Sequence, residues 1–277
     1  MLCSPSLREA WGKGSGDGGR HDTRQRQGTR MTVENENDLA KLLRIGKICA
    51  LALQHMLERI EPGMTTAQLD AIGAAFLKQH GARSAPILAY RFPGHICISL
   101  NHEAAHGIPG SRRIQPGDLI NVDVSAELEG YWADTGASAI VPPSRPEYEA
   151  LCQAAREARS AGINAAYAGR PLNAIGRAVE AVAKRTGYQI IRDLGGHGVG
   201  RHIHEKPNVP NHYDRSRREK LTEGLVITIE PFLTTGRGQI LTARDNWTLK
   251  TADKMPVAQY EHTIVINGSC PIIVTAP

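Results

Sequence analysis

The sequence lacks an uninterrupted apolar segment of about 18 residues, the length that a membrane-spanning helix requires. Its first residues also lack the apolar core of a signal peptide. Cysteine is scarce: the five cysteines are scattered and include no C-x-x-C pair, which argues against a disulfide framework. These absences predict a cytoplasmic protein with reduced thiols and no membrane partner.

Excess charge is small and unevenly placed. The net charge is +5, but residues 1–30 alone hold six basic and three acidic side chains. This segment also has six glycines and little apolar periodicity, so we predict a disordered tail. Such a tail fits a basic arm that contacts the ribosome or RNA transiently. It also fits a tail without function, or an upstream start codon with Met31 as the true initiator, and we favour these two interpretations. The rest of the chain is nearly balanced, so no specific nucleic-acid partner is expected.

The segment Leu119–Thr135 predicts a β-hairpin with an aspartate on each arm. Apolar and polar residues alternate along the first arm, which carries Asp123, and the second arm carries Asp134. We expect the turn near residues 129–130 and a bulge at Gly130 that brings both carboxylates to one face. Two adjacent carboxylates repel each other, so the fold must place a proton or a cation between them.

Three further side chains fit a cation site. Glu230 and Glu261 each lie within an apolar strand pattern, where an unneutralised charge is costly. His197 lies in GGHG, where glycines allow a close approach to a centre. Four carboxylates and one imidazole would balance two divalent cations, and such a donor set suits Mn, Fe, Co or Zn. Taken alone, each of these residues is more often an ordinary surface or core group.

A long helix followed by a shorter one is predicted twice along the chain. Apolar spacing predicts helices over residues 37–60, with Asn37 as N-cap, and over residues 65–80. The same order, a long helix, a Pro/Gly break and a second helix, recurs over residues 146–167 and 172–186. Residues 82–95 and the GGHGVGRHIHEKP segment are predicted loops, and residues 257–266 a final strand. The repeat indicates two related halves within one catalytic domain over residues 31–277.

The motifs HGIPG, GDLINVDV, GYWADT, GGHGVGRHIHEKP, TIEP and AQYEHT occur in this order. Together they resemble the type I methionine aminopeptidases over roughly residues 37–272. The resemblance implies the α+β pita-bread fold, with pseudo-two-fold halves and a curved antiparallel sheet flanked by helices. It also implies a monomeric enzyme that removes the N-terminal Met from nascent, deformylated polypeptides with a small second residue.

The resemblance further implies a role for each matching residue. A dinuclear centre of Fe2+, Mn2+, Co2+ or Zn2+ would activate the attacking hydroxide. Its ligands would be Asp123, Asp134, His197, Glu230 and Glu261, with Asp134 and Glu261 bridging. His106 would contact the scissile amide nitrogen, His204 would donate to the carbonyl oxygen, and Glu230 would also shuttle a proton.

The substrate pocket is where the sequence departs from this family. Cys97 and Trp247 match family pocket positions, whereas Phe92 replaces a usual tyrosine and Ile203 a usual phenylalanine. Pro86 and Ala89 stand where the family typically has Cys and Tyr. The pocket is therefore predicted to be apolar but altered in shape.

Two rival functions share these motifs. An Xaa-Pro aminopeptidase or prolidase-type enzyme has the same fold, but usually carries an extra N-terminal domain that 30 residues cannot supply. A non-catalytic relative that binds RNA or ribosomes would have lost ligands, whereas all five are present here.

Overall fold

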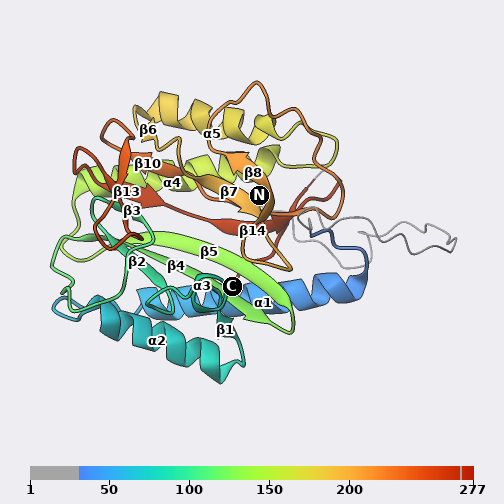
Figure 1. Ribbon diagram of the computed structural model, residues 1–277. Coiled ribbons are helices and arrows are strands. Elements are labelled where there is room, and N and C mark those ends of the chain that lie inside the picture. Colours follow the sequence, from blue (N-terminus) through green and yellow to red (C-terminus); the bar gives the residue numbers. More distant parts are fainter. Residues whose placement is uncertain (1–30, 269) are drawn as a thin grey trace, which may run out of the picture.

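The computed structural model describes residues 31–268 and 270–277, so the predicted tail lies outside the described residues. Two helix pairs flank a layer of strands (Figure 1). Helices α1 (Glu36–Leu57) and α2 (Thr66–Gln79) cover one side, and α4 (Pro146–Ala165) and α5 (Asn173–Thr186) cover the other. This arrangement of two helix pairs around strands matches the two halves predicted from the repeated order of elements.

The long helices follow from their caps and their apolar faces. The Asn35 side chain accepts the Asp38 N–H and begins α1, two residues before the predicted cap. A reciprocal capping box between Thr65 and Gln68 begins α2. Buried residues recur along α1 at helical spacing, so this face packs against the central hairpin and contributes to the largest core cluster.

The central hairpin consists of β4 (Leu119–Leu128) and β5 (Tyr131–Ile140), joined at Glu129 and Gly130. Both turn residues have positive φ, 53° and 81°, as a two-residue hairpin turn with the right twist requires. The register is regular throughout, with Asp134 opposite Ser125, two positions from Asp123. The predicted bulge at Gly130 is therefore wrong: a regular register already places both aspartates on one face, because alternate residues share a side of the sheet.

The remaining strands form small antiparallel sheets. β1 (Arg83–Ser84) and β2 (Cys97–Leu100) extend the hairpin sheet. A five-stranded sheet contains β7 (Gly195–Gly198), β8 (Glu205–Pro210), β9 (Val226–Ile229), β14 (His262–Val265) and β15 (Ile272–Ile273). Two three-stranded sheets contain β6 (Gln189–Ile190), β10 (Phe232–Thr234) and β13 (Val257–Gln259), and β3 (Glu103–Ala105), β11 (Ile240–Thr242) and β12 (Leu249–Thr251).

Three predicted segments differ in the structure. The predicted loop 82–95 contains β1 and the short helix α3 (Ala85–Tyr90). Ser84 caps the start of this helix, and a proline lies in its first turn. The GGHG segment is a strand. It packs so closely against Thr228 that a Cβ added at Gly196 would lie 2.2 Å from the Thr228 carbonyl oxygen, so only glycine fits there. The predicted final strand is divided into β13 and β14 at residues 260–261.

In the part of the chain that the structure describes, no helix combines the length and the apolar character that crossing a bilayer requires.

Candidate metal centre

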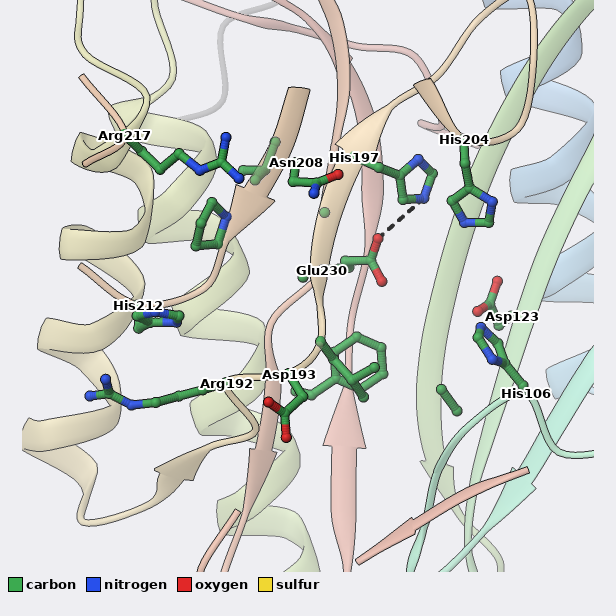
Figure 2. A pocket seen from close by; sticks show the side chains of 17 residues that line it. His106, Asp123, Arg192, Asp193, His197, His204, Asn208, His212, Arg217 and Glu230 are labelled. Carbon is green, nitrogen blue, oxygen red and sulfur yellow. Dashed lines mark ion pairs between the residues drawn. The ribbon is translucent and has the colours of Figure 1, made fainter. Parts of the chain in front are cut away.

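Side chains from both halves converge at one point. Asp134 on β5, His197 on β7 and Glu261 between β13 and β14 each offer a ligand atom, and these atoms lie within 4.8 Å of one another. Glu230, just after β9, places Oε1 3.4 Å from His197 Nε2, and Asp134 Oδ2 lies 3.8 Å from the same nitrogen. Asp123 on β4 lines the same cavity as His197 and Glu230 (Figure 2). The structure thus brings all five predicted ligands together.

The electrostatics of this cluster require a neutralising partner. Burial raises the pKa of Asp123 to about 6. Burial, and then the charge of neighbouring carboxylates, raise the pKa values of Asp134, Glu230 and Glu261 well above the usual range. Among the described residues, Asp134 Oδ1 and Glu261 Oε1 are buried without a hydrogen-bond partner. Buried, unpaired carboxylate oxygens around an imidazole fit divalent cations, which would hold the carboxylates ionised.

The imidazole of His197 is already arranged as a ligand. Burial lowers its pKa to about 3, so the ring is neutral. Nδ1 lies 2.9 Å from the Gly198 carbonyl oxygen, which can only accept, so Nδ1 carries the proton. The lone pair therefore resides on Nε2, the nitrogen that faces Asp134 and Glu230. This is the tautomer that metal coordination requires.

Neighbouring polar groups orient the carboxylates. The Thr228 hydroxyl donates to Glu230 Oε1 at 2.8 Å and accepts the His197 N–H at 3.0 Å. The Gln259 side-chain amide donates to Glu261 Oε2 at 3.0 Å. Such outer contacts fix the orientation of ligands and raise metal affinity.

Comparison with known proteins identifies the family of this centre. The model of metallopeptidase family M24 matches residues 40–268. The chain belongs to metallopeptidase family M24. Within this family, methionine aminopeptidase 2 of Bacillus subtilis (strain 168) is 47% identical over 247 residues, which span 88% of this chain and 99% of that protein. The predicted assignment as a metallo-aminopeptidase is thereby confirmed, and the family carries divalent metal binding.

Solved structures support the same conclusion. The chain superposes on the methionine aminopeptidase of Rickettsia prowazekii with a TM-score of 0.85 at 33% identity, covering 89% of this chain and 100% of that one. The prolidase from Pyrococcus furiosus superposes with a TM-score of 0.74 at 22% identity, covering 90% of this chain and 66% of that one, a likeness of fold alone. The predicted pita-bread fold is therefore confirmed.

Two further histidines of this M24 chain face the cavity. His106 and His204 line a volume of about 400 Å³ together with Asp123, His197 and Glu230. Burial lowers the pKa of His106, and burial and then His106 lower that of His204 to about 4. Both rings are therefore neutral at neutral pH. Each can donate a hydrogen bond from one nitrogen while the other accepts.

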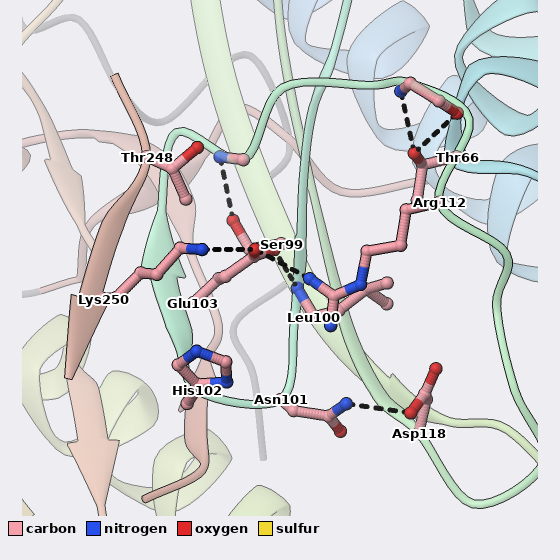
Figure 3. A network of polar contacts seen from close by, with 12 residues as sticks. Thr66, Ser99, Leu100, Asn101, His102, Glu103, Arg112, Asp118, Thr248 and Lys250 are labelled. Carbon is pink, nitrogen blue, oxygen red and sulfur yellow. Dashed lines mark hydrogen bonds and ion pairs between the residues drawn. The ribbon is translucent and has the colours of Figure 1, made fainter. Parts of the chain in front are cut away.

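A largely covered carboxylate fixes strand β3, which ends just before His106. Glu103 on β3 accepts the Leu100 N–H at 2.9 Å and the Arg112 guanidinium at 2.7 Å, and Lys250 lies 3.5 Å away (Figure 3). His106 follows this strand with φ 55°, a strained conformation for a residue with a side chain. These contacts hold the backbone that turns the His106 ring into the cavity.

The four predicted pocket residues lie in different surroundings. Phe92 is buried and meets Trp247 edge to face at 5.3 Å between ring centroids. Cys97 is buried on β2 directly opposite Asp123. Ile203 is buried in the largest core cluster. Of these four residues, Cys97 is the one whose strand position lies directly opposite a residue of the carboxylate cluster, and a shared apolar pocket stays a prediction.

Sequence reasoning missed three residues of the M24 site. Thr228 and Gln259 support the ligands, and Tyr90 lies 2.5 Å from His204 through its hydroxyl. Alternation along the strands places Thr228 on the same face as Glu230, and Gln259 on that of Glu261, so a signal was available for both. Tyr90 offers no such signal, since helix α3 was predicted to be a loop.

Proposed function

We propose that this protein is a methionyl aminopeptidase that removes the N-terminal methionine from nascent, deformylated polypeptides with a small second residue. The observation that carries the proposal is the convergence of Asp134, Glu230 and Glu261 on the neutral His197, in a cavity that Asp123 also lines. The similarity to proteins named methionine aminopeptidase supports the substrate. We also propose that residues 31–277 form one catalytic domain, acting as a monomer in the cytoplasm with at most transient ribosome contact.

Two divalent ions would be held by the five predicted ligands. Among the described residues, Asp134 and Glu261 each have a buried carboxylate oxygen without a hydrogen-bond partner, which leaves that oxygen available to a cation. When bound, such ions acidify water and polarise the scissile carbonyl. Fe2+, Mn2+, Co2+ and Zn2+ all suit this donor set.

The side chains of the protein itself would position the substrate and move protons. His204 donates a hydrogen bond to the scissile carbonyl oxygen, where charge develops during attack. Glu230, as an ionised carboxylate beside the bound cations, would take a proton from the attacking water and pass it to the leaving amine. His106, which also lines the cavity, would contact the scissile amide nitrogen.

The methionine side chain would enter the predicted apolar pocket beside Cys97. Phe92 and Trp247 supply aromatic surface there, and Ile203 buttresses it from the core. Pro86 and Ala89 on α3 replace larger or more polar groups usual in the family, so the pocket accepts a thioether with a changed outline.

The rival activities receive less support. The likeness to prolidases extends to the fold alone. A binding protein without catalysis would not need these ligands in one place, and ligand atoms of Asp134, His197 and Glu261 lie within 4.8 Å of one another.

The testing experiment compares Met-Ala-Ser with an Xaa-Pro peptide under reducing conditions, with each of the four metals. We expect release of Met alone. Replacement Asp123→Ala should lower kcat/KM by at least about a hundred-fold and reduce metal content, because a ligand is lost. The exposed Glu147→Ala on α4 serves as the control and should match the wild type. Wild-type turnover in Asp123→Ala would refute the assignment of the centre, and cleavage of only the Xaa-Pro peptide would refute the substrate.

A further inference from the structure

Helix α3 holds an aromatic hydroxyl against the cavity. The Ser84 hydroxyl accepts the Ile87 N–H and donates to the His95 carbonyl oxygen at 2.8 Å, so the start of the helix is tied to the neighbouring segment. Arg91 adopts a left-handed conformation with φ 56° and ends the helix. Tyr90, the last helical residue, is therefore held in place although its side chain is nearly half exposed.

The Tyr90 hydroxyl reaches the ring of His204. Its oxygen lies 2.5 Å from Nδ1, and the two ring centroids are 5.4 Å apart with the planes tilted by 45°. Partial burial, and then the charge of Asp134, raise the pKa of Tyr90 above its ordinary value, so the phenol keeps its proton. Nδ1 is the ring nitrogen within reach of this hydroxyl, and it can accept when the ring hydrogen is on Nε2.

We propose that Tyr90 is a positioning residue that donates its hydroxyl proton to His204 Nδ1 and thereby fixes the tautomer with hydrogen on Nε2. The ring nitrogen left to the cavity then carries a proton and can donate to a substrate carbonyl oxygen. In the other tautomer Nε2 would be a bare acceptor and would repel that oxygen. The inference rests on the proposed function of His204, and it adds the group that makes this histidine a donor.

The structure also limits how Tyr90 acts. Its hydroxyl is engaged by His204 and not by a ligand of the candidate metal centre. Its side chain is 45% exposed, so the contact can be lost without opening the core. We therefore expect removal of the hydroxyl to change turnover more than folding or metal content.

The test compares Tyr90→Phe with the wild type in the metal-loaded enzyme. We expect kcat for Met-Ala-Ser to fall about three- to ten-fold with KM nearly unchanged, the size expected for one lost hydrogen bond. Imidazole nitrogen NMR on protein labelled with 15N-histidine should show the His204 signals moving from the Nε2–H form towards a mixture of tautomers. Tyr148→Phe on α4, whose ring packs on Arg145, is the matched control and should change neither readout.

Wild-type kcat in Tyr90→Phe would overturn the proposal. Unchanged His204 signals would also overturn it, whatever the turnover, because the loss would then be merely structural. A wild-type protein that fails to cleave Met-Ala-Ser would instead refute the proposed function, while the NMR comparison would still decide whether Tyr90 sets the tautomer.

Discussion

Thr228 serves the candidate metal centre through two hydrogen bonds, although it was not predicted to be a ligand. Its side chain is fully buried, and replacing it by the isosteric valine leaves the His197 N–H and one Glu230 oxygen unpaired. We expect Thr228→Val to weaken metal binding by about 10- to 100-fold. Stability should fall by about 1–3 kcal/mol. Isothermal titration with Mn2+ and thermal unfolding measure the two effects.

The control for this substitution is Thr234→Val. Its hydroxyl is equally buried but donates to the Pro256 carbonyl oxygen, away from the ligands. It should lose comparable stability and keep wild-type metal affinity. Equal affinity loss in both variants would show that Thr228 acts through general destabilisation.

Among single residues, the sequence predicts those that stand out from the pattern of their immediate neighbours. Carboxylates in apolar strands are conspicuous, so Glu230 and Glu261 could be selected before the fold was known, and the structure gathers them. Tyr90 could not be selected in this way. Its role depends on His204, 114 positions later in the chain, and on a helix that the sequence pattern does not reveal.

Among the elements, the hairpin of β4 and β5 depends on its turn. Gly130 has φ 81°, and an added Cβ would meet nothing within 4 Å, so any cost of Gly130→Ala is conformational. We expect a loss of about 1–2 kcal/mol in the free energy of unfolding. Metal affinity should stay unchanged, because Asp134 lies four residues away along the strand, roughly 13 Å. Urea unfolding and metal titration provide the measurements.

Gly110→Ala is the companion variant. It also meets nothing within 4 Å but does not have a positive φ, so its stability should equal that of the wild type. If both alanine variants were equally stable, the left-handed turn would not be the source of strain.

The elements that sequence predicts well are those with long periodic patterns. The four long helices lie where apolar spacing placed them, within about three residues at each end. Strand β7 was predicted as a loop because GGHG contains three glycines. In this strand glycine is needed because the backbone packs closely against Thr228, not because a loop needs flexibility. Thr228 lies on β9, later in the sequence, so the local pattern of GGHG does not reveal the need.

At the scale of the whole molecule, the clustered carboxylates predict a pH effect in the metal-free protein. Unfolded carboxyl groups ionise near pH 4, whereas the raised pKa values of Asp134, Glu230 and Glu261 keep protons bound in the folded state. The folded state then binds more protons, so stability falls as the pH rises. Between about pH 7.5 and 8.5 His197 and His204 are neutral in both the folded and the unfolded state, so they do not oppose this trend.

We therefore expect the free energy of unfolding of the EDTA-treated protein to fall across this range, by about 1.4 kcal/mol per pH unit for each retained proton. The metal-loaded protein should show little change, because bound cations keep the carboxylates ionised. Urea titrations at several pH values measure both slopes. Parallel slopes with and without metal would contradict the expected coupling.

The five converging side chains are divided between the two parts of the chain that the repeated order of elements marks out. Asp123 and Asp134 come from the part before Pro142, and His197, Glu230 and Glu261 come from the part after it. If proteolysis between these parts separated them, neither fragment would contain all five predicted ligands. Any chemistry of this cluster therefore requires the two parts of the chain packed together, and neither fragment alone can perform it.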